Sequence, residues 1–217
     1  MVLAAGLGTR LRPLTNERPK ALVEINGRTL LEITLARLRR FGVHEVIINT
    51  HHFADVLLRY LEDHNNFGMQ IQISREDDLL LDTGGGLKKA AKFFQRENGD
   101  TPFIVHNVDV LSTIDLHEMV ALHRKHDALA TLAMRDRKSS RLLLFNSHSE
   151  LCGRQLAKDG APVTEMARAC LGGATCPAPV VHLLAAYADE ADLEIGLPVL
   201  RVDTTLVDRD RERVAVR

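Results

Sequence analysis

Residues 1–20 combine glycines with positive charge, which suits a phosphate group. Gly6 and Gly8 follow a short apolar run at residues 2–5. The charged residues of this stretch are Arg10, Arg12, Arg18 and Lys20, against Glu17 alone, which gives +3 in a chain of formal net charge −1. Glycine removes the Cβ atom where a phosphate approaches the backbone, and N–H groups at the end of a strand can point at an anion. Arginine adds bidentate donors and lysine a point charge. The pattern predicts a phosphate-binding loop.

Two other nucleotide-binding motifs fit this stretch less well. A Rossmann dinucleotide site needs a third glycine, where this chain has Leu11, and an acid at the end of the second strand, where it has Asn49 and Thr50. A Walker P-loop sequence does not occur anywhere in the chain. A tight turn with a purely structural role stays open, because a lone G-x-G is weak evidence.

A second glycine cluster comprises Thr83, Gly84, Gly85 and Gly86 and precedes an expected helix. Its three glycines would let a flat or bulky ligand come close to the backbone, and a helix N-terminus behind them would add partial positive charge. A flexible surface turn is the alternative for the same residues.

An acid, Asp109, follows the apolar strand expected at residues 103–106. In open α/β sheets, ligands bind at the carboxyl ends of the strands. One carboxylate together with phosphate oxygens is a common way to hold Mg²⁺, which keeps most of its water ligands. Asp109 is therefore a candidate Mg²⁺ ligand, although a helix N-cap is the alternative role for such a residue.

The elements that must position these residues alternate between strand and helix. Short connections between them predict an α/β fold, with an open, mostly parallel, Rossmann-like sheet. Strands are expected at residues 2–5, 45–50, 69–74, 103–106, 128–134 and 142–145, with an extended stretch at 19–25 that ends in a turn at Asn26 and Gly27. Helices are expected at residues 29–41, 53–63, 87–96, 115–126 and 182–191, and residues 201–217 read as a solvated tail.

Composition excludes several classes of protein. With 217 residues, 45% of them apolar and 26% charged, the chain is long enough for one large or two small globular domains. The net charge of −1 argues against general binding of nucleic acid. No apolar run approaches the ~20 residues that span a bilayer, and no signal peptide is recognised. Three cysteines without a C-x-x-C pair favour a reducing, cytoplasmic location.

Taken together, the motifs resemble the start of the sugar-1-phosphate nucleotidyltransferases. The resemblance rests on L-A-A-G-L-G-T-R-L-R-P-L-T at residues 3–15, then P-K-A-L-V-E-I-N-G, then T-G-G-G, then N-x-D after a strand. The sequence L-D-T-G-G-G-L is most similar to the branch of N-acetylmuramate-1-phosphate uridylyltransferases and mannose-1-phosphate guanylyltransferases. The resemblance implies a three-layer α/β/α fold of the glycosyltransferase-A-like nucleotidyltransferase type.

The resemblance also implies roles for individual residues. Leu3, Ala4 and Ala5 would lie under the nucleobase and ribose. The triphosphate would be wrapped by Gly6, Gly8, Thr9 and Arg10, and the base or sugar region would meet Thr83, Gly84 and Gly85. Arg10, Lys20 and Asp109 would be catalytic, with Lys20 neutralising the α-phosphate and Asp109 holding Mg²⁺.

The implied reaction transfers a nucleoside monophosphate from an NTP to a sugar 1-phosphate, with Mg²⁺, and releases pyrophosphate. No nucleic acid or membrane partner is expected, and a homo-oligomer stays open. Three alternatives are a homologue that binds nucleotide without turnover, transfer to a non-sugar phosphate such as phosphocholine, and a Rossmann oxidoreductase.

The resemblance covers residues 1–160, the expected nucleotidyltransferase core. Residues 161–217 form an atypical segment, either a partial sugar-binding region or a divergent tail. All seven Phe lie at or before Phe145, and the last 72 residues hold a single aromatic, Tyr187. The family's second metal-binding aspartate motif is not found there; the candidates Asp203, Asp208 and Asp210 lack its flanking residues.

Overall fold

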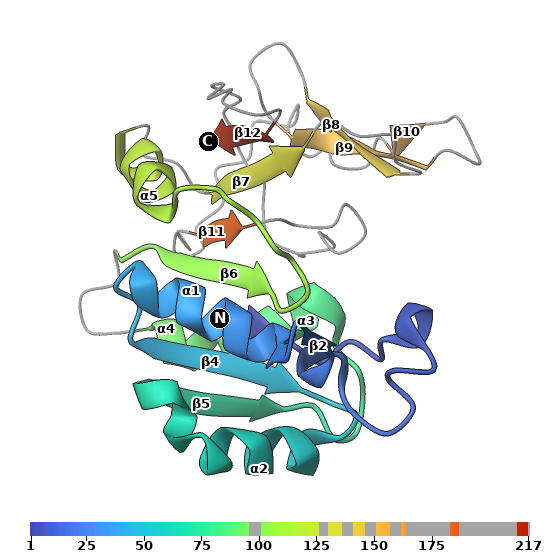
Figure 1. Cartoon of the computed structure of the whole chain (residues 1–217). Helices are drawn as coiled ribbons and strands as arrows, with labels where there is room; N and C mark the ends of the chain where they lie inside the picture. Colours follow the sequence, from blue (N-terminus) through green and yellow to red (C-terminus); the bar gives the residue numbers. More distant parts are fainter. Residues whose placement is uncertain are drawn as a thin grey trace. The chain divides into compact units, whose positions relative to one another are not determined.

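The fold is described from a computed structural model of the chain (Figure 1). It describes residues 1–95, 101–125, 130–135, 141–145, 151–156, 162–163, 183–186 and 212–216, with side chains up to residue 133. The chain divides into two compact units. The first comprises Met1–Gly99 with Val105–Thr113, and the second comprises Asp100–Ile104 with Ile114–Arg217.

A parallel sheet forms the centre of the first unit. Its strands are β1 (Val2–Leu3), β4 (Glu45–Thr50), β5 (Gln70–Arg75) and β6 (Phe103–Asn107). Strand β1 lies between β4 and β6, with Val2 opposite both Ile48 and His106, and β5 pairs with the other edge of β4. All three pairings are parallel, as expected from the alternation of strands and helices. The carboxyl ends of β1, β4, β5 and β6 therefore lie at the same edge of the sheet.

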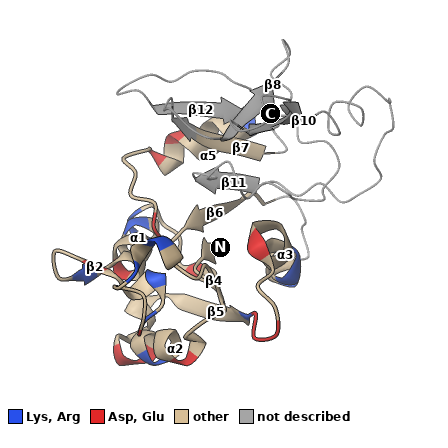
Figure 2. Cartoon of the chain, turned by 90° about the vertical axis from the view of Figure 1, so that its right-hand side faces the viewer, with Lys and Arg blue, Asp and Glu red and all other residues tan. Residues whose placement is uncertain are grey.

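Helices cover both faces of this sheet. Helix α1 (Leu30–Arg40) begins after Thr29, whose Oγ1 accepts a hydrogen bond from the Glu32 N–H at 3.0 Å, a typical N-cap. It buries Leu31, Leu35 and Leu38, which share one apolar face, and it confirms the helix expected at residues 29–41. Helix α2 (Ala54–Asp63) buries Leu57 and Leu61 in the same way. Helices α1 and α3 lie on opposite faces of the sheet, which confirms the three-layer α/β/α arrangement for this unit (Figure 2).

The third helix begins earlier than the sequence predicts. A helix was expected at residues 87–96, after the second glycine cluster, but α3 (Asp82–Lys89) contains the glycines, and the short α4 (Ala91–Phe94) follows it. The prediction of its start was wrong, because glycine was taken as a helix breaker. Tertiary contacts outweigh that preference: the Leu81 N–H donates to Glu76 Oε2 at 3.0 Å, and Gly86 packs directly on the Glu76 side chain.

Residues 19–25 are only partly extended. A 3-10 turn, η2 (Lys20–Leu22), replaces the first half of the expected stretch, because the Leu22 and Val23 N–H groups bond to the carbonyls of Pro19 and Lys20. The second half is strand β2 (Glu24–Ile25), which pairs with β3 (Arg28–Thr29). Asn26 and Gly27 join them with φ of 51° and 75°, as the predicted turn requires. The other 3-10 turns of this unit are η1 (Thr9–Leu11) and η3 (Asn65–Gly68).

In the second unit, β7 (Ala130–Arg135) pairs with two other strands. Strand β11 (Leu183–Ala186) pairs with β7 in parallel, and β12 (Glu212–Val216) pairs with β7 antiparallel. Helix α5 (Leu116–Lys125) contacts all three strands, and its buried His123 meets Thr131 of β7 through Nδ1 and Oγ1 at 3.0 Å. A second, antiparallel sheet holds β8 (Arg141–Phe145), β9 (Leu151–Leu156) and β10 (Pro162–Val163).

Two expectations for the C-terminal part were wrong. The helix expected at residues 182–191 is strand β11 where the structure describes it, because the short apolar run 183–186 pairs with the edge of β7. The tail expected at 201–217 includes strand β12, because residues 212–216 find a second partner edge on β7. Among the described residues, no helix is both long and apolar enough to cross a membrane.

Candidate active site

The loop after β1, residues 4–8, is built on buried backbone. Ala4 and Ala5 are 5% and 6% exposed, and the Ala4 N–H donates to Asn49 Oδ1 at 2.7 Å. Gly8 has a φ of 63°, and a Cβ atom there would lie 2.9 Å from Thr15 Cγ2 and 3.1 Å from Lys20 Cβ. Thr15 also holds this loop by donating its hydroxyl to the Gly8 carbonyl at 2.8 Å. Gly8, the second glycine of the motif, is therefore required by the backbone conformation and packing of the loop, whether or not a ligand binds.

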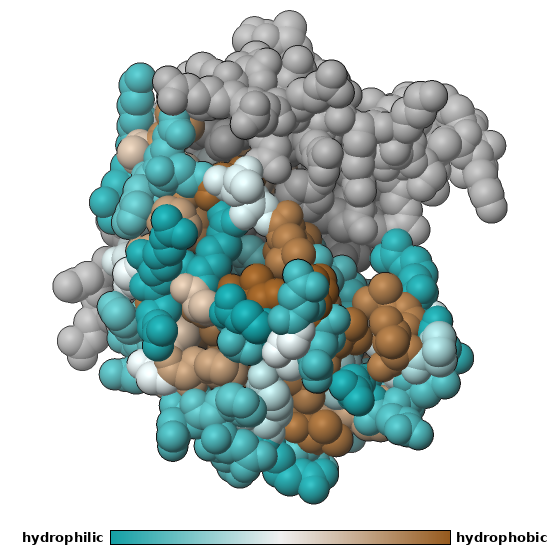
Figure 3. Space-filling view, in the orientation of Figure 1, coloured by the Kyte–Doolittle hydropathy of each residue, from teal (hydrophilic) through white to brown (hydrophobic). Residues whose placement is uncertain are grey.

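Gly6 differs from Gly8, because a Cβ atom at Gly6 would have no neighbour within 4 Å. Within the described residues, the N–H groups of Gly6, Leu7 and Gly8 donate to no protein acceptor. Leu7 is 45% exposed, and Figure 3 shows apolar surface on the segment that follows β1. The loop thus presents open backbone donors and open space at Gly6, as an anion site requires.

Lys20 and Asp109 are brought together from separate parts of the chain. Lys20 Nζ forms an ion pair with Asp109 Oδ2, and the two side chains are 19% and 37% exposed. Lys20 opens η2, next to the loop residue Gly8. Asp109 is positioned by Val108, whose N–H donates to the Leu3 carbonyl at 3.1 Å and whose carbonyl accepts from Thr34 Oγ1 at 3.2 Å. The pair therefore lies where β1 and β6 end.

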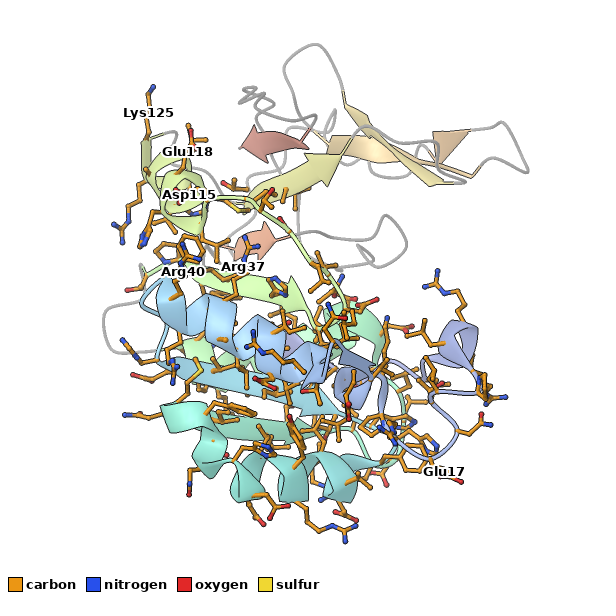
Figure 4. The ribbon with its side chains drawn as sticks, in the orientation of Figure 1. Glu17, Arg37, Arg40, Asp115, Glu118 and Lys125 are labelled. Atoms are coloured by element: carbon orange, nitrogen blue, oxygen red, sulfur yellow. The ribbon has the colours of Figure 1, made fainter. Side chains whose placement is uncertain are left out.

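The remaining charges of the first twenty residues lie further out. Arg10 and Arg12 are exposed, and Arg18 faces Glu24 at 3.7 Å. Glu17, the one acid of the stretch, lies at the outer end of the segment between β1 and β2 (Figure 4). Because this acid is exposed to solvent, it does not neutralise the buried side of the loop.

The second glycine cluster lies in α3, on the opposite face of the sheet from α1 (Figure 2). A Cβ atom on Gly85 would lie 2.8 Å from Leu81 Cβ, and one on Gly86 would lie 2.8 Å from Glu76 Oε1. Thr83 and Gly84 are half-buried in the first turn. Contacts inside the protein thus explain why glycine stands at positions 85 and 86. Contact of Thr83, Gly84 and Gly85 with a ligand stays a prediction.

Two residues that the sequence reasoning did not select lie at the centre of this region. Asn49 is the second-last residue of β4, and Glu76 directly follows β5; they are 3% and 1% exposed. Asn49 Nδ2 donates to Glu76 Oε1 at 2.8 Å. The available signal was their place in the sequence, since both lie at the carboxyl ends of parallel strands, where ligands bind in such sheets.

Asp109 fits a single Mg²⁺ ligand by its chemistry and exposure. It offers a hard carboxylate oxygen beside a loop with open N–H donors, and Mg²⁺ is usually held by one or two carboxylates together with phosphates and water. Within the described residues, no three His, Cys, Asp or Glu side chains gather into a metal site. Asp203, Asp208 and Asp210, the candidates for a second ligand, lie outside the described residues.

His106 is a buried histidine of β6, three residues before Asp109. The ring is 1% exposed, its Nδ1 lies 2.7 Å from the Asn107 carbonyl, and its Nε2 is buried with no partner in the described part of the chain. Burial lowers the pKa of His106 to about 4, and the Arg37 charge acts in the same direction. His106 is therefore neutral at pH 7, and it lies two residues before Val108, which positions Asp109.

Comparison with solved structures supports the fold. HddC from Yersinia pseudotuberculosis, complexed with GMP-PN, superposes with a TM-score of 0.61 at 20% identity, over 92% of this chain and 86% of that chain. A UDP-glucose pyrophosphorylase complexed with UDP-glucose superposes with a TM-score of 0.56 at 16% identity, over 75% and 72%. These neighbours confirm the nucleotidyltransferase-like α/β fold.

Comparison with curated relatives concerns the N-terminal part of the chain. The N-acetylmuramate alpha-1-phosphate uridylyltransferase of Caulobacter vibrioides is 46% identical over 111 residues, 50% of this chain and 44% of the relative. The UTP–glucose-1-phosphate uridylyltransferase of Synechocystis is 36% identical over 140 residues, 61% and 36%. The mannose-1-phosphate guanyltransferase of Neurospora crassa is 33% identical over 135 residues, 62% and 36%. The chain spans less than half the length of these relatives.

A family model supplies the assignment. The model described as nucleotidyl transferase matches residues 1–141, which include the loop at residues 4–8, Lys20, α3 and Asp109. The match and the curated relatives confirm the resemblance to sugar-1-phosphate nucleotidyltransferases. The chain belongs to the nucleotidyl transferase family.

Proposed function

We propose that this chain transfers a nucleoside monophosphate from an NTP to a sugar 1-phosphate and releases pyrophosphate. The observation that carries the proposal is the Lys20–Asp109 pair at the end of β1 and β6, beside three open backbone N–H groups. That arrangement supplies a cation, a carboxylate and anion-binding donors within one site. The relatives named as uridylyl- and guanylyltransferases support the same reaction class.

The chemistry needs positioning and charge neutralisation more than proton transfer. A sugar-phosphate oxygen forms a bond to the α-phosphorus as the bond to the β-phosphate oxygen breaks, and pyrophosphate leaves in line. The attacking oxygen is already anionic at pH 7, so no general base is required.

The chain's own residues would divide this work. The N–H groups of Gly6, Leu7 and Gly8 would hold the phosphates that become pyrophosphate, and Lys20 would neutralise charge at the α-phosphate. Arg10, exposed on η1, would contact the same phosphates. Asp109 would hold Mg²⁺, and the bound ion would screen the charge of the triphosphate.

Two alternatives to transfer onto a sugar 1-phosphate can be distinguished by experiment. Binding of a nucleotide without turnover is favoured by the absence of a recognisable second aspartate motif in the sequence. Transfer to a non-sugar phosphate has no specific support. The cytoplasmic location expected from the cysteines stays part of the proposal.

Pyrophosphate release tests the proposed function. The purified chain would be incubated with Mg²⁺, one of five nucleotides (ATP, CTP, GTP, UTP or dTTP) and one of a panel of sugar 1-phosphates. Release that needs both substrates and stops with EDTA is the expected result, and the responding pair names the base and the sugar. Stabilisation against heat by an NTP, without release, would replace transfer with nucleotide binding.

A further inference from the structure

The two glycine-containing segments of the site are joined by a chain of buried hydrogen bonds, here called the Asn49–Glu76 network. It begins at the Ala4 N–H, which donates to Asn49 Oδ1 at 2.7 Å. It continues from Asn49 Nδ2 to Glu76 Oε1 at 2.8 Å and ends where the Leu81 N–H donates to Glu76 Oε2 at 3.0 Å. One end thus fixes the loop after β1, and the other fixes the start of α3.

The network is closely packed. Glu76 is 1% exposed and Asn49 3% exposed. A Cβ atom on Gly86 would lie 2.8 Å from Glu76 Oε1 and 2.9 Å from Asn49 Nδ2. A side chain at position 86 would therefore displace one of the two partners. The third glycine of the cluster is required by the network.

The backbone of Glu76 is held as firmly as its side chain. Its N–H donates to the Thr50 carbonyl at 2.7 Å, and its carbonyl lies 2.5 Å from His51 Nδ1. The carboxylate consequently extends from a fixed point between β4 and α3. A buried carboxylate is costly unless each oxygen accepts hydrogen bonds, and here both oxygens do.

We propose that Glu76 is a positioning residue for nucleotide binding, because it sets the distance between the loop at residues 4–8 and the first turn of α3 through Asn49 and Leu81. This inference rests on the proposed function, in which these two segments line the nucleotide. Glu76 itself touches neither phosphate nor base in this proposal. It acts through the Ala4 and Leu81 amides.

The polarity of the network provides a sharp test. In Glu76→Gln, the side chain has one acceptor and one donor, so it can serve Leu81 or Asn49 but not both. In Asn49→Asp, two carboxylates meet in a buried site. In the double variant Asn49→Asp/Glu76→Gln, Asp at position 49 accepts from Ala4 and from the new amide, and the amide oxygen accepts from Leu81. All three hydrogen bonds and the net charge are restored.

The affinity for nucleotide is the direct measurement. Titration calorimetry of the full chain with UTP and with GTP, each with Mg²⁺, would give Kd for the wild type, both single variants and the double variant. We expect about 10- to 100-fold weaker binding in each single variant and recovery to within about threefold in the double variant. The KM for the sugar 1-phosphate should change by less than about twofold. Asp78→Asn, an exposed acid two residues along, is the matched control.

Three results would overturn the proposal. Unchanged Kd in folded Glu76→Gln would mean that the network does not position the nucleotide segments. Weak binding in both single variants and in a folded double variant would mean that a carboxylate at position 76 is itself required. A fall in melting temperature with unchanged Kd well below melting would assign Glu76 to stability alone. Because Kd is measured without transfer, a wild type that binds UTP or GTP and releases no pyrophosphate rejects the proposed function and leaves this test intact.

Discussion

Lys20 and Asp109 form an ion pair between residues that are 89 positions apart in the chain, counted from 20 to 109. Both side chains are partly exposed, and Lys20 lies beside Gly8 in the loop whose N–H groups at residues 6–8 are open. A cation and a carboxylate held together without substrate can separate when phosphate binds, the lysine toward the phosphate and the carboxylate toward a metal. This relationship leads to the first two predictions.

Lys20→Ala should lower kcat for pyrophosphate release by about 10²–10³, the effect of losing one donor that stabilises charge in a transition state. The variant should fold, because alanine at position 20 keeps the backbone conformation and hydrogen bond of η2. Lys92→Ala removes an exposed lysine from α4 and is the control for loss of charge. Near-wild-type turnover in Lys20→Ala would exclude Lys20 from the chemistry.

Asp109→Asn should weaken binding of Mn²⁺, a paramagnetic substitute for Mg²⁺, measured by water-proton relaxation in the presence of an NTP. The amide keeps the shape of the side chain and loses the charge that a hard cation needs. We expect at least a tenfold rise in the apparent Kd for Mn²⁺, because the ion loses one charged ligand. Asp78→Asn is the control, and equal Mn²⁺ binding in both variants would reject Asp109 as a metal ligand.

Sequence reasoning reached the residues whose positions depend on local pattern. The parallel strands place their carboxyl ends together, so the loop after β1 and Asp109 after β6 were expected at one edge, where the structure has them. Helices α1 and α2 followed from apolar spacing. The ion pair itself was not predicted, since Lys20 and Asp109 were assigned separate tasks.

The missed features depend on contacts between distant segments. Asn49 and Glu76 carry no motif, and their importance arises because Ala4, Leu81 and Gly86 converge on them. The apolar run of β11 fits a helix or a strand equally well by pattern, and pairing with β7 decides in favour of the strand. The charges around β12 concealed a second strand that pairs with β7. The spacing of apolar residues in a segment does not show which strand that segment will pair with.

Gly8→Ala and Gly6→Ala form a matched pair that separates folding from ligand binding. Gly8→Ala should lower the free energy of unfolding by about 1–2 kcal/mol, because φ is 63° and the new Cβ would meet Thr15 and Lys20. Gly6→Ala should leave stability unchanged within about 0.5 kcal/mol, because nothing lies within 4 Å of its Cβ. Urea denaturation measures both.

Gly6→Ala should also change nucleotide binding without changing stability. If phosphate approaches the backbone at Gly6, Gly6→Ala should weaken NTP binding about tenfold with stability intact, since a methyl group would occupy the approach. Calorimetric titration with the NTP that responds in the pyrophosphate assay gives this value. Wild-type affinity in Gly6→Ala would place the phosphates elsewhere.

His106 should make stability depend on pH between about pH 6.5 and pH 4. Burial lowers its pKa from 6.5 to about 4 in the folded chain, so the unfolded chain takes up a proton first as the pH falls. The free energy of unfolding should therefore decrease as pH falls through this window, by on the order of 3 kcal/mol in total from this group. In His106→Gln, that part of the decrease should be absent, although the variant starts from a lower stability at pH 7.

Urea denaturation at pH 7, 6, 5 and 4.5 measures the difference, and His44→Gln, at an exposed histidine, is the control. Because a neutral buried imidazole is favoured at pH 7, the difference in stability between wild type and His106→Gln should shrink steadily with acidification; a constant difference would show that His106 takes up its proton equally in the folded and unfolded chains.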